Sequence, residues 1–405
     1  MIREENYEIW HEGVEHAIYS PISLPSKTGV LIIGGGITGI TSAYLLAKEG
    51  INPILLEKNE IGEFVTCATT GFLTQILDTA PSKLVSLYSK DTAREIFKSH
   101  QNAIDEIEKI IISEKIECEF ERCSNYIYAN SKKEEKLLLK LTEKYKSLGV
   151  NAEYKKDNKL KFNSFGYIEI FNQAKFHALK YVNSLAQIAV KNGAIISENA
   201  KVLNLKKEKE GVLVEIENVP GIKAKKVFSA TYMPFGKPPH LERKYNMYRS
   251  YVVEYKIPKN IMREGTYEDT LKPYHYFRID SKADFDRLII GGNDNLSALK
   301  IDHELGSKVI KDYTKELFKN NDFEEVRHWS GSISEPVNKI ACIGETLAGQ
   351  ANGENIFYAF GFSGNGLTYS YIASKIFTDQ LVDKNNPYSK IYSINNKIPW
   401  WKNIF

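Results

Sequence analysis

Three glycines and one carboxylate lie close together near the N-terminus. Gly34, Gly36 and Gly39 follow the G-x-G-x-x-G spacing, and Glu57 comes at about the 20-residue interval that accompanies this pattern. The first glycine permits a tight turn, the second lets the backbone approach a pyrophosphate, and the third lets a helix pack closely on a strand. A carboxylate at Glu57 can accept hydrogen bonds from a ribose and would repel a 2′-phosphate. The pattern therefore predicts binding of an adenine dinucleotide and disfavours NADP.

The flanking residues predict the elements that hold these groups in place. Residues 30–33 are an apolar run typical of a buried strand, and the run that follows has the apolar spacing of a helix. Ile37 and Thr38 open this helix, where N–H groups without partners and the helix dipole favour phosphates. Residues 53–56 predict the next strand, which leads to the carboxylate and to Lys58. This order of strand, turn, helix, strand and acid is much more specific than the glycine spacing alone.

A second strand, glycine turn and helix occur near the C-terminus. Residues 355–360 predict a strand, and 369–381 predict a helix. The turn between them can meet the polar edge of a large bound ring, and its candidate contacts are Gly361, Gly364, Asn365, Gly366 and Leu367. Between the two glycine turns, the hydroxyls of Thr69 and Thr70 are candidates to contact the phosphates.

Composition and charge exclude several classes of function. The 405 residues are 42% hydrophobic and 26% charged, which is typical of a soluble protein with room for two cores. A net charge of +3 and the lack of a basic cluster with interleaved aromatic residues argue against a nucleic-acid partner. The four cysteines form no C-x-x-C pair, no histidines lie at ligand spacing, and no leader pattern begins the sequence. We therefore expect a cytoplasmic protein without a metal site.

The order of the expected elements divides the chain into two domains. Helices are expected at 81–115, 132–148 and 173–191, and 249–295 is rich in strands, which indicates an antiparallel sheet in a second domain. The predicted fold class is α/β, with a second domain of the α+β type. Residues 1–27 are expected to form an arm and 396–405 a tail. The first domain is assigned residues 28–80, 166–235 and 330–395, and the second 81–165 and 236–329.

The two glycine turns, with an antiparallel sheet between them, resemble the flavin amine oxidoreductases related to glycine oxidase, D-amino-acid oxidase and sarcosine oxidase. The resemblance covers roughly residues 28–390 and is most specific in IIGGGITGITSAYLL…ILLEK and NIFYAFGFSGNGLTYS. It is closest to bacterial members with a Rieske iron–sulfur domain, which share the WSG at Trp329 and the FSGNGLTY sequence. The C-x-H and C-x-x-H ligand pairs of that domain do not occur in these 405 residues, so we expect no Rieske domain here.

The resemblance implies FAD, bound in a Rossmann-like domain of the glutathione-reductase type. By motif, the three N-terminal glycines would hold the pyrophosphate and Glu57 the ribose, and the backbone of Val202 would face the adenine. Residues 364–367 would supply N–H groups to flavin O2 and N1, which stabilises reduced flavin. The cysteine that tethers FAD in sarcosine oxidases has no counterpart near Ser330, so FAD is expected to be noncovalent.

The catalytic residues of the family are matched less closely. The carboxylate-binding arginine of the amino-acid oxidases has no counterpart in the segment GSISEP, and Ile289 stands where sarcosine oxidases have a lysine. Arg278 is the candidate to pair with a substrate carboxylate, although a strand arginine is more often an ion-pair partner. Tyr251, Tyr276 and Trp329 are candidates to wall the pocket, although strand aromatic residues more often belong to the core.

The resemblance implies transfer of hydride from a C–N bond of an amine or amino acid to FAD, with oxygen or a protein or quinone acceptor reoxidising the flavin. The missing lysine favours a dehydrogenase over an oxidase. Two alternatives stay open: oxidation of a C–O bond, as in glycerol-phosphate flavoproteins, and a flavin-holding electron-transfer subunit that acts with a partner. The tail with Trp400 and Trp401 could contact a membrane or a protein, although packing on its own chain is the more frequent outcome.

Overall fold

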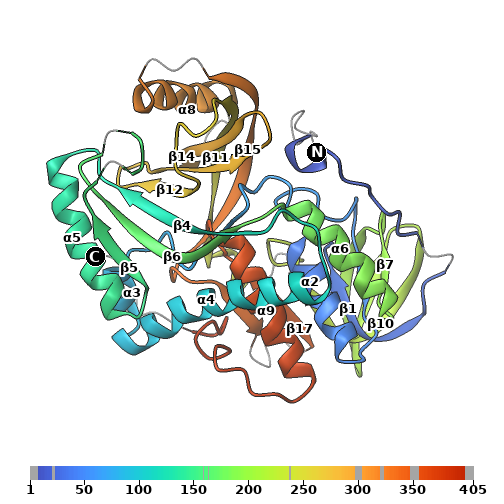
Figure 1. Cartoon of the computed structure of the whole chain (residues 1–405). Coiled ribbons are helices and arrows are strands. Elements are labelled where there is room, and N and C mark those ends of the chain that lie inside the picture. The colour runs from blue at the N-terminus through green and yellow to red at the C-terminus, as the bar shows by residue number, and fades with distance from the viewer. Residues whose placement is uncertain are drawn as a thin grey trace.

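The computed structural model describes residues 8–20, 23–157, 159–162, 164–236, 239–296, 303–319, 323–346 and 355–396. These residues form two β-sheets with helices packed around them. Figure 1 shows the first sheet at the right of the molecule and the second at the upper left, with α9 (Gly366–Leu381) between them. The expected contact through Trp400 and Trp401 lies outside the described residues.

The first sheet is parallel at its centre. Its parallel strands, in spatial order, are β17 (Ile356–Phe360), β10 (Val219–Ser229), β1 (Lys27–Ile33), β2 (Ile54–Leu56) and β7 (Ile195–Ser197). The last four residues of β1 are buried, as expected of a strand that is covered on both faces. Antiparallel strands complete the sheet: β16 (Cys342–Glu345) beside β17, and β8 (Val202–Glu208) with β9 (Gly211–Ile216) beside β10.

The two helices that follow the glycine turns pack against each other. α2 (Ile37–Lys48) follows the first turn and α9 follows the second. Small residues let the helices approach closely, through two hydroxyl pairs at 2.8 Å: Thr38–Ser370 and Ser42–Ser374. The partners in each pair are 332 positions apart in the sequence. The two glycine turns therefore lie side by side in space.

The second sheet is almost entirely antiparallel. Its strands, in spatial order, are β15 (Glu324–Pro336), β11 (Tyr245–Ile257), β14 (Asp286–Leu296), β13 (His275–Ser281), β12 (Gly265–Asp269), β4 (Glu121–Tyr128), β6 (Tyr167–Lys175) and β3 (Phe72–Leu73), with β5 (Ala152–Lys155) also paired to β6. One pair of neighbours, β12 and β4, is parallel. The antiparallel sheet expected in the middle of the chain is thus present.

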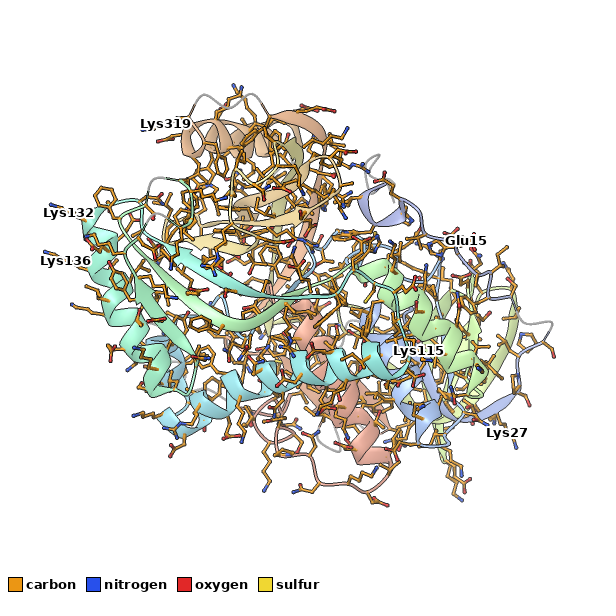
Figure 2. The ribbon with its side chains drawn as sticks, viewed as in Figure 1. Glu15, Lys27, Lys115, Lys132, Lys136 and Lys319 are labelled. Atoms are coloured by element: carbon orange, nitrogen blue, oxygen red, sulfur yellow. The ribbon has the colours of Figure 1, made fainter. Side chains whose placement is uncertain are left out.

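Helices cover the outside of both sheets. α6 (Ala178–Lys191) packs on α2, and α8 (His303–Leu317) packs on β11 and β14. The lysine-rich helix α5 (Lys132–Ser147) begins with Ser131 and Glu134 in a capping arrangement. Figure 2 shows Lys132 and Lys136 pointing away from the molecule, so the charges of this face are solvated.

The structure differs from the expected elements at several boundaries. The helix expected at 81–115 is two helices, α3 (Pro81–Leu87) and α4 (Lys90–Ser113), because the side chain of Ser89 accepts from Thr92 N–H and caps the second. The helix expected from residue 173 is α6 and begins later, because residues up to Lys175 complete β6. β3, β6 and the second half of β15 belong to the second sheet, although the predicted division placed their residues in the first domain.

Candidate active site

A cavity of about 620 Å³ lies between the two sheets. Its walls come from β1, β2, β8, β17 and the segment after β10 in the first sheet, and from β11, β12, β13 and β15 in the second. A volume of this size is typical of small-molecule and cofactor sites. Thirteen of the predicted cofactor contacts line it: Gly34, Gly36, Ile37, Thr38, Glu57, Lys58, Thr69, Thr70, Val202, Gly364, Asn365, Gly366 and Leu367.

Two of the predicted contacts, Gly39 and Gly361, do not line the cavity. A Cβ at Gly39 would lie 1.9 Å from Gly34 O, so this glycine lets α2 pack on the turn, which is the role its spacing predicted. A Cβ at Gly361 would lie 2.9 Å from Pro336 Cβ, and the φ of this glycine is +74°. Gly361 is therefore needed for packing and for backbone conformation, and its contact with the ligand stays a prediction.

Glu57 stands at one end of the cavity, at the end of β2. Its Oε2 accepts from Gly35 N–H at 2.6 Å, and its Oε1 accepts from Asn59 N–H at 2.9 Å. These bonds fix the carboxylate, and each oxygen keeps a second lone pair. Because Glu57 lines the cavity, those lone pairs are available to ligand hydroxyls.

The N-terminus of α2 faces the cavity next to Glu57. Gly36 is its N-cap and provides no side-chain cap, and Ile37 N–H donates to Thr66 Oγ1 at 3.1 Å. The other N–H groups of the first turn have no partner within the helix. The helix dipole adds partial positive charge at this point. This end of the cavity is therefore suited to an anionic group.

A segment from Thr66 to Thr70 forms the next part of the wall, and residues behind it hold its backbone. Trp10 Nε1 donates to Thr69 O at 2.8 Å, and Trp329 Nε1 donates to Ala68 O at 3.0 Å. Trp329 itself is buried and does not line the cavity. The prediction that Trp329 walls the pocket is therefore wrong, because its ring lies behind the segment and supports it.

Arg278 also lies behind this segment and does not line the cavity. Its Nε and Nη2 donate to Asp280, and its Nη1 donates to Thr70 O at 2.8 Å and more weakly to Gly71 O and Phe176 O. All three nitrogens are occupied within the protein, and only 2% of the residue is exposed. The predicted pairing with a substrate carboxylate is therefore wrong, and Arg278 is a structural ion-pair partner.

Strand alternation separates the two tyrosine candidates. Tyr251 points away from the cavity and packs under α8, where a Cβ at Gly306 would lie 2.2 Å from its ring. The prediction for Tyr251 is wrong, because its neighbours Ser250 and Val252 face the cavity instead. Tyr276 does line the cavity, and its hydroxyl lies 2.9 Å from Ser250 Oγ. Burial, and then the charge of Asp294, raises the pKa of Tyr276, so its hydroxyl stays protonated.

The C-terminal glycine turn closes the far end of the cavity. Gly364 N–H donates to Asp78 Oδ2 at 2.8 Å, so the protein itself occupies one of the predicted donors. Asn365 is the N-cap of α9 but its side chain does not cap the helix, and its Nδ2 donates to Ile76 O. Gly366 lines the cavity, and a Cβ there would meet no atom within 4 Å. Open space therefore lies against the backbone of the first turn of α9.

Sequence reasoning missed two acidic residues at this end. Asp78 follows β3, and Glu268 lies on β12, a strand that was not expected. Asp78 keeps accessible surface although it is deep in the protein, because it faces the cavity. Burial, and then the charge of Asp78, raises the pKa of Glu268 to about 7. Strand alternation in GTYED could have indicated that Glu268 shares a face with Thr266, but it gives no sign of a cavity.

The residues that the structure describes contain no helix that is long and apolar enough to cross a membrane. Within the same ranges, no three His, Cys, Asp or Glu side chains gather in a way that could hold a metal ion.

Comparison with protein families gives one match over most of the chain. The model of the DAO family, described as FAD dependent oxidoreductase, matches residues 29–380. A curated relative, the putative Rieske 2Fe-2S iron–sulfur protein of Bacillus subtilis, is 28% identical over 393 residues. The match covers 95% of this chain and 74% of that protein.

Solved structures with a similar fold include oxidases that are named for different substrates. Glycine oxidase from Geobacillus kaustophilus has a TM-score of 0.78 at 16% identity, over 93% of this chain and all of that one. L-α-glycerophosphate oxidase from Mycoplasma pneumoniae, with FAD bound, has a TM-score of 0.72 at 17% identity, over 93% of this chain and all of that one. At these identities the likeness shows the fold, and the substrate has to be inferred from the site.

Proposed function

The chain belongs to the DAO family of FAD-dependent oxidoreductases, and from this premise we propose that it takes hydride from a carbon bonded to nitrogen, in an amine or amino acid. The observation that carries the proposal is that both glycine turns line the same cavity. One turn suits the diphosphate and the other suits a ring. The cavity also continues past them to the second sheet, where a substrate would bind.

The residues of the cavity fit FAD. We propose that the first turn of α2 faces the pyrophosphate, that Glu57 accepts from the ribose, and that Val202 lies at the adenine. The open space at Gly366 fits close approach of the flavin edge to the N–H groups of α9. No cysteine is among the described residues that line the cavity, which supports noncovalent binding. On this basis the first sheet belongs to the cofactor domain and the second sheet to the substrate domain.

FAD, when bound, supplies the acceptor of a hydride. The protein supplies orientation and shielding from water. The hydroxyl pair Tyr276–Ser250 fixes one wall, and Val252, Ile333 and Phe362 make the adjoining surface apolar. In this class of reaction the protein must hold the neutral amine with its carbon toward the flavin. It must also take up the proton that an ammonium ion loses.

The proposal is tested by an absorbance spectrum followed by anaerobic reduction. The purified protein, supplied with FAD, is expected to show bound flavin bands that bleach on addition of a primary or secondary amine or an amino acid. Air, a quinone or an iron–sulfur protein is then added to identify the acceptor. A protein that binds FAD but is bleached only by alcohols would refute the assignment to C–N bonds.

A second candidate function is that of a flavin-holding subunit which passes electrons to a separate partner. The Bacillus subtilis relative, whose name denotes an iron–sulfur protein, supports this candidate. We would adopt it if no amine or amino acid bleached the flavin while a reduced iron–sulfur protein did so. Oxidation of a C–O bond in a phosphate ester has less support, because the described residues at the inner end of the cavity offer carboxylates and no lysine or arginine.

Replacing Glu57 with glutamine is expected to weaken FAD binding. The side chain keeps its length but loses the charge that accepts from ribose hydroxyls, and a hydrogen bond to a charged group contributes about 1.5–3 kcal/mol. FAD should therefore bind roughly 10- to 100-fold more weakly in a fluorescence titration of the apoprotein. Glu60→Gln is the matched control, because Glu60 is exposed and does not line the cavity. Equal affinities for the two variants would contradict the assigned role of Glu57.

Replacing Gly366 with leucine is expected to block FAD without harming the apoprotein. A side chain there meets no protein atom at its Cβ and would extend into the cavity. Overpacking against the ligand costs about 1–3 kcal/mol, so FAD affinity should fall roughly 5- to 150-fold. The urea midpoint of the apoprotein should stay within experimental error of the wild type. If the variant bound FAD normally, the flavin edge could not lie against this turn.

A further inference from the structure

The inner end of the cavity is acidic. Asp78 and Glu268 both line it, beside Tyr274 and Tyr276. The lysines among the described lining residues are Lys58 and Lys201, which stand with Glu57 and Val202 at the opposite end. The described residues of the inner end therefore provide negative charge and tyrosine hydroxyls, but no lysine or arginine to pair with a carboxylate of a ligand.

The second sheet aims Glu268 into the cavity. On β12, Glu268 is paired with Tyr276 on β13, and directly opposed residues of antiparallel strands share one face. Its Oε1 accepts from Asn125 Nδ2 at 3.3 Å, and Thr266 Oγ1 in turn donates to Asn125 Oδ1 at 2.8 Å. The long hydrogen bond from the uncharged Asn125 positions the carboxylate but does not balance its negative charge. Within the described part of the chain, Glu268 makes no ion pair.

Asp78 reaches the same end from the segment after β3. Its Oδ2 accepts from Gly364 N–H, and a Cβ at Gly364 would lie 3.0 Å from its Oδ1. Burial raises the pKa of Asp78, although the bond from Gly364 opposes this effect, and the charge of Glu335 raises it further. No described lysine or arginine forms an ion pair with Asp78 either.

Asp78 and Glu268 line one cavity, and no described lysine or arginine pairs with either of them. Their mutual repulsion costs free energy unless a cation binds between them. Two like charges in one cavity repel each other, and an ammonium placed between the two carboxylates removes most of this repulsion. Asn365, of which only 4% is exposed, also leaves its Oδ1 without a protein partner at this end of the cavity. The carboxylate oxygens of Asp78 and Glu268 are hydrogen-bond acceptors, which suits a ligand with several N–H groups.

We propose that the substrate is an amine that enters as a cation and has no carboxylate on the carbon next to nitrogen, and that Asp78 and Glu268 flank its ammonium group. This inference rests on the proposed function and narrows its substrate class. An α-amino acid would bring its own carboxylate close to two others, with no basic side chain of the described lining to receive it. The repulsion should exclude it.

Glu268 also has a role in the proton transfer that must precede oxidation. The substrate ammonium gives one N–H proton to the Glu268 carboxylate, which leaves a neutral amine and a carboxylic acid, and no electrons move in this step. The nitrogen lone pair can then support loss of hydride from the adjacent carbon to the acceptor that FAD would supply, which yields an iminium ion. The charged and titratable groups around Glu268 are Asp78, Asp269, Tyr145 and Tyr274, with Asn125 and Tyr276 as uncharged neighbours.

The test uses ligands that bind but cannot be oxidised, because the carbon next to nitrogen carries no hydrogen. tert-Butylamine is compared with 2-aminoisobutyrate, which replaces one methyl group by a carboxylate. 2-Phenyl-2-propylamine is compared with 2-amino-2-phenylpropionate in the same way. Each ligand is titrated into the FAD-loaded protein, and the shift of the flavin absorbance bands gives its dissociation constant without turnover.

The amines are expected to bind at least tenfold more tightly than their carboxylated partners. Asp78→Asn and Glu268→Gln should each reduce this preference, while Glu335→Gln, which removes a nearby acid outside the cavity lining, should retain it. Flavin content and the urea midpoint show whether each variant is folded. The comparison of ligands in the wild-type protein does not depend on the variants.

Two results would overturn the inference in distinguishable ways. If the carboxylated ligands bind as tightly as the amines or more tightly, and amino acids bleach the flavin, the proposed function stands and the acidic subsite is refuted. If no ligand of either kind binds and neither amines nor amino acids bleach the flavin, the proposed function itself fails.

Discussion

Alanine in place of Gly39 is expected to abolish FAD binding and to destabilise the apoprotein. Its Cβ would lie 1.9 Å from Gly34 O and 3.3 Å from Ile32 Cγ2. The first of these is a clash with backbone, so no change of rotamer relieves it. α2 would have to move off the turn, and we expect a loss of about 3 kcal/mol in the free energy of unfolding, the upper part of the range for overpacking. Urea unfolding of the apoprotein and the flavin content of the purified protein measure the two effects.

Gly29→Ala is the matched control for this prediction. Gly29 lies in β1, just before its buried part, and a Cβ there would meet no atom within 4 Å. The chemical change is the same, but there is nothing to collide with. Alanine also loses less conformational entropy than glycine on folding. We therefore expect full flavin content and unchanged or slightly raised stability. If Gly39→Ala retained FAD as well as Gly29→Ala does, close packing of α2 on the turn would not be needed for the cofactor site.

The cofactor end of the cavity could be predicted because its requirements are local in sequence. A strand, a glycine turn, a helix and an acid within about 30 residues specify one supersecondary unit, and the structure has all four parts in place. The contact between the two glycine turns is different, since 332 positions separate Thr38 from Ser370. The family resemblance predicted this contact, whereas the residue spacing within each turn does not indicate it.

The substrate end could not be predicted, because it depends on which face of each strand is turned inward. Tyr251 and Ser250 are neighbours, and a shift of one residue decides which of them meets the cavity. β12, with the sequence GTYED, contains glycine and acids that are depleted in strands, so the strand that carries Glu268 was missed. Asp78 belongs to a segment without regular structure, which periodicity cannot place.

The sequence near Arg278 does indicate the ion pair that this residue makes. Residues two apart on a strand lie on the same face, and Asp280 is two residues after Arg278. A carboxylate at that position makes an ion pair the first expectation for a strand arginine. The structure has this pair, with Lys175 Nζ on the other side of Asp280 Oδ1 at 3.1 Å. The backbone of the Thr66–Thr70 segment, and so one wall of the cofactor site, is held through this buried network.

Replacing Arg278 with methionine is therefore expected to lower the free energy of unfolding and to leave the selectivity among ligands unchanged. The variant removes the arginine donor from Thr70 O and Phe176 O, leaves Gly71 O only its bond from Phe176 N–H, and leaves Asp280 with a single buried cation. Removing one member of a buried pair typically costs 3–5 kcal/mol, and we expect a loss of about 4 kcal/mol in the free energy of unfolding. Arg94→Met is the control, since the Arg94–Asp91 pair is exposed and should contribute less than about 1 kcal/mol.

The same variant should change the response to acid, with a sign set by Asp280. Burial alone would raise the pKa of Asp280, but the charges of Arg278 and Lys175 outweigh it and lower the pKa to about 2. The unfolded value is about 3.9, so this pair stabilises the fold above about pH 4 and the contribution is lost as pH falls toward 2. Without Arg278 the folded pKa rises, and acid unfolding followed by circular dichroism should begin at a higher pH. If Arg278→Met instead kept wild-type stability and acid resistance but lost affinity for amino-acid carboxylates, Arg278 would be a substrate-binding residue.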